Sequence, residues 1–105
     1  GLTNTEREKF NFQKGYAYFT SKNKKEAINY FNKVVNSKEY GSQAKYYLGF
    51  MNYETDNYQE ANKYFDQVSG DEKYKEKLTY FQALYTILRR ILESRGLSRI
   101  YKLEF

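Results

Sequence analysis

The chain has 105 residues, which is enough for one modest hydrophobic core. It contains 13 Tyr and 8 Phe but no Cys, His, Pro or Trp. Disulfides, the usual zinc sites and a Ser-His-Asp triad are therefore excluded. The net charge of +5, with 13 acidic residues mixed among 18 basic ones, bears on solubility more than on a type of partner.

Helical periodicity begins near the start of the chain. Thr5 followed three residues later by Glu8 has the spacing of a capping box and predicts the first helix. Aromatic residues then recur at helical intervals, at Phe12, Tyr16 and Phe19. Residues 20–23 interrupt the pattern and predict a turn.

Three further helices are predicted from caps and apolar spacing. Asn23 and Asn57 each stand three residues before a Glu, which predicts two equivalent helix N-termini. Apolar residues then mark a helix after each cap and one between them: Ala27, Ile28, Phe31, Val34 and Val35; Ala61, Tyr64, Phe65 and Val68; and Ala44, Tyr47, Leu48 and Met51.

A long fifth helix is predicted over 72–95, capped by Asp71 and ended by the Arg95–Gly96 stop signal. Its apolar positions are Leu78, Phe81, Leu84, Leu88 and Leu92. The tail, 97–105, has Leu97, Ile100 and Tyr101 at helical spacing, and three interpretations stay open: a cap on the fifth helix, a frayed end, or a contact with a partner. Without alternating Val, Ile and Thr runs, the sequence predicts an all-α fold.

The sequence repeats itself. A shift of about 34 residues, the length of one helix-pair repeat, aligns nine identical pairs. They are Gly15/Gly49, Asn23/Asn57, Glu26/Glu60, Ala27/Ala61, Tyr30/Tyr64, Phe31/Phe65, Val34/Val68, Tyr40/Tyr74 and Tyr46/Tyr80. The same shift exchanges one aromatic residue for another at Phe12/Tyr46, Tyr16/Phe50, Phe19/Tyr53 and Tyr47/Phe81.

Two segments carry a resemblance to a known family. Gly15-x-x-Tyr18 with Ala27-x-x-x-Phe31, and Leu48-Gly49 with Ala61-x-x-x-Phe65, resemble the tetratricopeptide repeat (TPR) family, although its early Trp and closing Pro are missing. The resemblance implies a right-handed solenoid of antiparallel helix pairs with about five helices. The expected domain covers 1–96, with repeats at roughly 8–41 and 42–75 and a capping helix over 72–95. The phrase Ala44-Lys-Tyr-Tyr-Leu-Gly49 is also similar, more weakly, to TPR segments of bacterial envelope-assembly proteins.

The resemblance implies a binding or scaffolding module, because most TPR proteins hold a peptide or partner protein in a groove lined by the first helix of each pair. By register, the expected groove is aromatic and consists of Phe12, Tyr16, Phe19, Tyr46, Phe50, Tyr53, Tyr80 and Leu84. Such a groove suits an apolar peptide or a partner helix. Two alternatives remain: a homodimer in which a second copy fills the groove or covers the tail, and rings that only pack between neighbouring helices.

Other activities are expected to be absent. Asp71 and Glu72 are expected to cap a helix rather than act as an acid/base pair, the glycines are scattered singly, and no enzyme activity, cofactor or metal is expected. Acidic residues mixed among the lysines disfavour nucleic acid, although aromatic side chains can stack on bases. No stretch approaches the roughly 18–20 apolar residues of a membrane helix. The compartment stays open: cytoplasmic, or periplasmic if a signal peptide has been removed.

Overall fold

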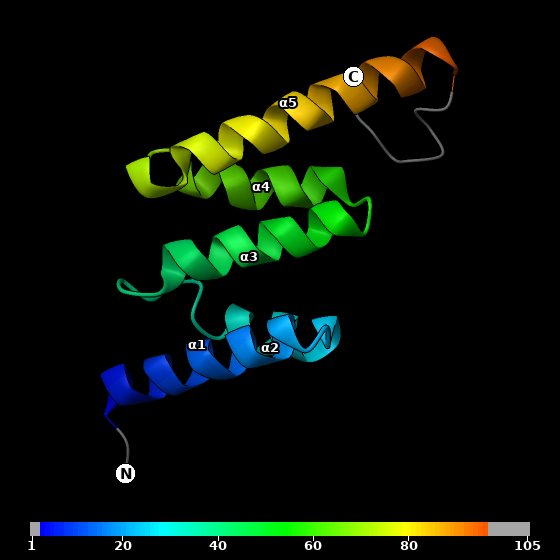
Figure 1. The fold of residues 1–105 in the computed structure, drawn as a ribbon. Helices are drawn as coiled ribbons and strands as arrows, with labels where there is room; N and C mark the ends of the chain where they lie inside the picture. The colour runs from blue at the N-terminus through cyan, green and yellow to red at the C-terminus, as the bar shows by residue number, and fades with distance from the viewer. Residues whose placement is uncertain (1–2, 97–105) are drawn as a thin grey trace. The chain divides into compact units, whose positions relative to one another are not determined.

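The computed structural model describes residues 3–96, apart from the side chain of Tyr85, and this part of the chain is all-α (Figure 1). It contains five helices in the order α1 (Asn4–Thr20), α2 (Lys24–Asn32), α3 (Gly41–Glu54), α4 (Tyr58–Val68) and α5 (Glu72–Ser94). The predicted all-α fold of five helices is therefore confirmed. The right-handed solenoid and TPR membership stay predictions. The tail, 97–105, and the three interpretations of it lie outside the described residues.

The chain divides into two compact units, Gly1–Leu48 and Gly49–Phe105, here called unit 1 and unit 2. Unit 1 contains α1, α2 and the first part of α3, while unit 2 contains the rest of α3 together with α4 and α5. The predicted bounds of a single domain and of its repeats stay predictions.

In unit 1, α1 and α2 form a hairpin and lie side by side (Figure 1). Gly15 allows this packing, because a Cβ atom at Gly15 would lie only 2.8 Å from Cδ1 of the Phe31 ring. Phe31 is completely buried. The buried apolar residues of the unit are Ala27, Phe31, Val34, Ala44 and Leu48. A small residue facing a large ring therefore lets the two helices of the hairpin approach closely.

The start of α1 differs from the prediction. The N-cap is Thr3, whose Oγ1 accepts a hydrogen bond from the Glu6 N–H at 3.2 Å and donates one to Glu6 Oε1 at 2.9 Å. Thr5 and Glu8 have the same spacing, but the Glu8 carboxylate instead accepts a hydrogen bond from the Ser37 hydroxyl at 2.8 Å. The predicted cap at Thr5 is therefore wrong, because α1 begins at Asn4 and Thr5 lies inside it.

The turns that follow α1 and α3 have the same backbone geometry. Lys22 and Asp56, 34 residues apart, both have a left-handed conformation, with φ of 64° and 62°. The next residue closes each turn: the Asn23 N–H donates to the Tyr18 carbonyl at 2.9 Å, and the Asn57 N–H donates to the Asn52 carbonyl at 2.8 Å. The sequence repeat is thus also a repeat of local structure.

The two predicted asparagine caps differ in their side-chain hydrogen bonds. Asn23 Oδ1 accepts a hydrogen bond from the Glu26 N–H at 3.3 Å, so this cap is confirmed. Asn57 occupies the N-cap position of α4 but makes no such bond. Its amide donates instead to Asn52 Oδ1 at 3.1 Å. A short polar side chain nearby therefore decides whether an asparagine at this position caps its helix.

The end of α2 also differs from the prediction, because the helix stops at Asn32 and leaves Val34 and Val35 in the following turn. The N–H groups of Lys33 and Val34 donate to carbonyls three residues earlier, Tyr30 and Phe31. Bonds of this tighter type are common in the last turn of a helix. Val34 nevertheless stays buried, so it has the packing role that its spacing indicates.

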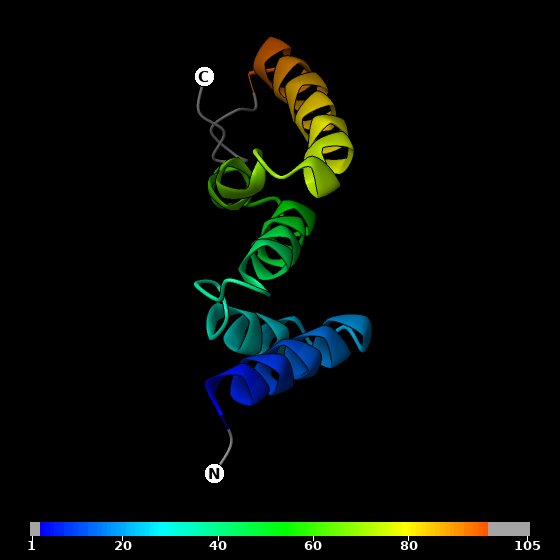
Figure 2. The ribbon, with the colours of Figure 1, turned by 90° about the vertical axis from the view of Figure 1, so that its left-hand side faces the viewer.

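In unit 2, α4 packs against α5 (Figure 2). Gly49, near the middle of α3, faces Phe65 of α4 as Gly15 faces Phe31. Asp71 caps α5, as predicted, by accepting a hydrogen bond from the Lys73 N–H at 3.0 Å. The helix ends as predicted at Arg95 and Gly96, where the glycine has a φ of 68°. The buried apolar residues of the unit are Met51, Tyr58, Ala61, Phe65, Val68, Tyr74, Leu78, Phe81 and Leu92.

Candidate binding surface

The eight residues predicted to line a groove divide equally between the two units. Patch 1, in unit 1, consists of Phe12, Tyr16, Phe19 and Tyr46, and patch 2, in unit 2, of Phe50, Tyr53, Tyr80 and Leu84. None of the eight is fully buried. Tyr16 and Tyr80 are exposed by 45% and 62%, and the other six are half-buried. That they form one continuous groove stays a prediction, and each patch is described within its own unit.

Patch 1 is arranged around the ring of Tyr47 in α3. The Tyr47 ring centroid lies 5.0 Å from that of Phe19, 5.7 Å from Tyr16 and 6.4 Å from Phe12. Tyr46 lies next to it at 5.6 Å. On its inner side Tyr47 stacks on the buried Phe31, with centroids 5.3 Å apart and ring planes 12° apart. Tyr47 thus joins the core of the hairpin to the predicted surface residues.

Patch 2 is arranged in the same way around Phe81 in α5. The Phe81 ring centroid lies 5.2 Å from that of Tyr53, 5.6 Å from Phe50 and 5.8 Å from Tyr80. Phe81 also stacks on the buried Phe65, at 5.2 Å and 18°. Leu84 lies three residues after Phe81 on α5. It is four residues after Tyr80 and therefore on the same side of the helix as Tyr80.

The two central rings were not among the predicted site residues. Tyr47 and Phe81 are 34 residues apart, and each contacts the equivalent residues of its own unit. The signal that could have identified them is their alignment in the repeat, where one aromatic residue replaces the other. Sequence spacing assigns each ring to its own helix, but it does not show which residues of the earlier helices the ring contacts.

Burial changes the acidity of three tyrosines in these patches. It raises the pKa of Tyr46, and it raises the pKa of Tyr47, to which the Tyr16 and Tyr46 hydroxyls add a smaller effect in the same direction. Burial, followed by the nearby Tyr80, also raises the pKa of Tyr53. Burial thus disfavours the charged form of these three tyrosine side chains.

The raised pKa of Tyr47 leads to a prediction about pH. Between the ordinary tyrosine pKa of about 10 and the higher folded value, the folded chain keeps a proton that the unfolded chain releases. Stability is therefore complete below about pH 10 and falls as the pH rises through the folded pKa, by at most about 1.4 kcal/mol per pH unit for one group. Urea unfolding between about pH 8 and 11 is expected to show a smaller fall for Tyr47→Phe than for the wild type. Identical pH dependences of the two proteins would contradict this prediction.

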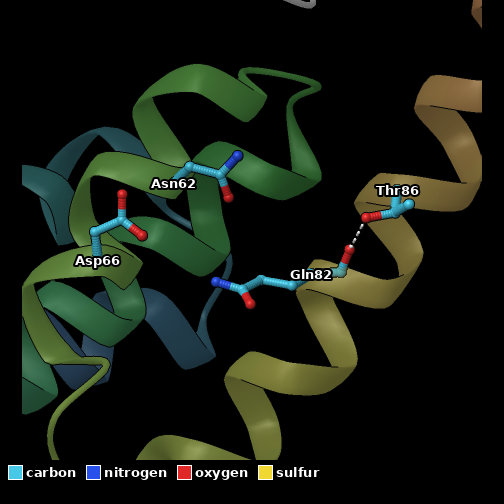
Figure 3. A pocket seen from close by; sticks show the side chains of 4 residues that line it. All are labelled: Asn62, Asp66, Gln82 and Thr86. Carbon is cyan, nitrogen blue, oxygen red and sulfur yellow. Dashed lines mark hydrogen bonds between the residues drawn. The ribbon is translucent and has the colours of Figure 1, made fainter. Parts of the chain in front are cut away.

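The described residues also form a polar pocket of about 280 Å³ in unit 2 (Figure 3). Asn62 and Asp66 of α4 line one side, and the Gln82 side chain extends toward them from α5. Thr86 completes the lining, and its hydroxyl donates to the Gln82 carbonyl at 2.9 Å. Sequence reasoning missed this pocket: i, i+4 spacing shows that each pair shares a helix face, but not that the two faces meet.

The pocket offers one carboxylate, two amides and one hydroxyl. Within residues 3–96, no cluster of acidic side chains could hold a metal ion, and no helix combines the length and apolar character that a bilayer-spanning segment requires. Comparisons with protein-family models, with curated proteins and with solved structures find no match to this chain.

Proposed function

We propose that the chain is a TPR-like protein-interaction module that binds an apolar segment of a partner protein on its aromatic patches. One observation carries the proposal: Tyr16 keeps 45% of its surface exposed although its ring lies against the partly buried Tyr47. Tyrosines of this kind offer a large apolar area together with a hydroxyl, and they are enriched at protein interfaces.

The repeated packing supports the TPR-like part of the proposal. In each unit a glycine faces a buried phenylalanine: a Cβ atom at Gly15 would lie 2.8 Å from Phe31, and one at Gly49 would lie 2.5 Å from Phe65. In each unit that phenylalanine stacks on a central ring, Tyr47 or Phe81. These two glycines and two phenylalanines are among the residues that carry the resemblance to the family.

The type of partner follows from the chemistry of the patches. Phe12 and Phe19 contact Tyr47, so patch 1 consists of aromatic rings, among which Tyr16 is the exposed one. Its four residues carry no charged side chain. A peptide with aliphatic or aromatic side chains on one face complements such a surface.

A peptide-display selection tests the proposal. We expect the immobilised protein to enrich peptides with apolar side chains at i, i+3/i+4 and i+7, or at alternate positions. The Tyr16→Ala variant is expected to bind the selected peptides at least about tenfold more weakly.

The matched control is Phe10→Ala. Phe10 is on the same helix and is 50% exposed, close to the value for Tyr16, but its ring neighbour is Lys14 rather than Tyr47. We expect this variant to keep wild-type affinity. Peptides that bind Tyr16→Ala as well as the wild type would sink the proposal.

A further inference from the structure

Helix α5 carries a third copy of the face that forms the patches on α1 and α3. The 34-residue shift aligns Tyr80, Leu84 and Ile87 with Tyr46, Phe50 and Tyr53 of α3, and aligns these in turn with Phe12, Tyr16 and Phe19 of α1. On α1 this face contacts the Tyr47 ring of α3, and on α3 it contacts the Phe81 ring of α5. On α5, Tyr80, Ile87 and Ile91 remain exposed by 62%, 55% and 45%. Within the described residues no helix follows α5 that could place a third central ring on this face.

These three exposed residues and the half-buried Leu84 form a regular stripe on α5. Tyr80, Leu84, Ile87 and Ile91, here called the α5 stripe, are spaced by four, three and four residues, which is the a/d pattern of a coiled-coil seam. The side chains that α5 buries within unit 2 lie elsewhere on the helix, at Tyr74, Leu78, Phe81 and Leu92. The α5 stripe is therefore a second apolar face, and its spacing suits a partner helix.

We propose that the α5 stripe binds the α5 stripe of a second copy of this chain, with the two helices antiparallel. A two-fold axis at the level midway between residues 85 and 86 places Tyr80 opposite the second copy's Ile91, and Leu84 opposite the second copy's Ile87. Each Tyr80 ring then lies against aliphatic side chains of the other copy. The stripe is complementary to itself because one end carries a ring and the other end carries aliphatic groups.

Charge favours the antiparallel over the parallel arrangement. Lys77 and Ser94 continue the heptad pattern at the two ends of the stripe. A parallel pair places Lys77 beside the second copy's Lys77, which is a like-charge contact in the seam. An antiparallel pair avoids this contact, because Lys77 then lies level with the uncharged Ser94 of the second copy.

This inference names a second copy as the partner of one surface and goes beyond the proposed function. Tyr80 and Leu84 belong also to patch 2, but Ile87 and Ile91 lie outside both patches. Substitutions at Ile87 and Ile91 therefore test self-association, whereas Tyr16→Ala tests binding of a foreign peptide. Either proposal can fail while the other stands.

Light scattering and sedimentation of the full chain test the inference. Between roughly 5 µM and 500 µM the wild type is expected to shift from monomer to dimer. The Ile87→Glu/Ile91→Glu variant is expected to stay monomeric, with helical circular dichroism unchanged because both side chains are exposed. Phe10→Glu, an equally exposed apolar position on α1, is the control and is expected to dimerise as the wild type does.

Several results would overturn the inference. One is a wild type that remains monomeric at roughly 500 µM, and another is an Ile87→Glu/Ile91→Glu variant that dimerises normally. A chain that dimerises only when residues 97–105 are deleted would show that this segment, and not a second copy, binds the α5 stripe.

Cysteine crosslinking tests the orientation, since the chain has no cysteine of its own. A Tyr80→Cys chain mixed with an Ile91→Cys chain of different tagged size is expected to give mainly the mixed disulfide. In the antiparallel pair, position 80 of one copy is about 16 Å along the helix axis from position 80 of the other, too far for a disulfide. A predominance of either homodisulfide would contradict the antiparallel arrangement.

Discussion

We expect Phe31→Ala and Phe65→Ala each to lower the free energy of unfolding by about 3–5 kcal/mol. Phe31 is completely buried and Phe65 is 1% exposed, and each is the ring on which the central aromatic residue of its unit stacks. Removing either ring leaves a cavity and withdraws support from the patch above it. Because small domains have total stabilities of about 5–15 kcal/mol, this loss is a large fraction of the whole.

Urea denaturation followed by circular dichroism measures these losses, and Phe10→Ala is the control. Phe10 is half-exposed, so its removal is expected to cost less than about 1 kcal/mol. Hydrogen exchange adds a spatial test: Phe31→Ala is expected to accelerate exchange most in α1 and α2, and Phe65→Ala in α4 and α5. Equal losses at Phe10 and Phe31 would show that the glycine-facing rings do not form the core.

Sequence periodicity predicted the helices well because the decisive signals are local. Asp71 before α5 and Gly96 after it act through hydrogen bonds and backbone angles within a few residues. Where such signals compete, the sequence alone does not decide. Thr3 and Thr5 both stand three residues before a glutamate, and the cap forms at Thr3 while Thr5 lies inside the helix.

The candidate site was predicted in composition but not in arrangement. Repeat register identified the residues that contact Tyr47 and Phe81, such as Tyr16, Phe19 and Tyr53, because they share helix faces. It did not identify the two central rings, because ring stacking between helices depends on how the helices pack. Exposure is also a property of packing, so sequence could not distinguish Tyr16 from its half-buried neighbours.

We also expect Gly49→Ala to destabilise the chain by about 1–3 kcal/mol, although alanine is the better helix former by about 1 kcal/mol. A Cβ atom at this position would lie 2.5 Å from Cε1 and 2.7 Å from Cδ1 of the Phe65 ring, closer than real contacts allow. Phe65 is buried, so its ring cannot move aside without disturbing its stacking on Phe81. The clash therefore outweighs the gain in helix propensity.

Gly70→Ala provides the matched control, because no atom lies within 4 Å of a Cβ built at Gly70 and its φ is not positive. There the same substitution is expected to be neutral, or to stabilise the chain by up to about 1 kcal/mol, because it restricts the unfolded state. The free energies of unfolding of the two variants, measured by thermal and urea denaturation, should thus change in opposite directions or by clearly different amounts.

In a Phe65→Leu background, where the clashing ring atoms are gone, the loss of unfolding free energy caused by Gly49→Ala should shrink by more than about 0.5 kcal/mol. If the cost of Gly49→Ala were the same in both backgrounds, the contact between this glycine and the ring would not be what fixes the spacing of α3 and α4.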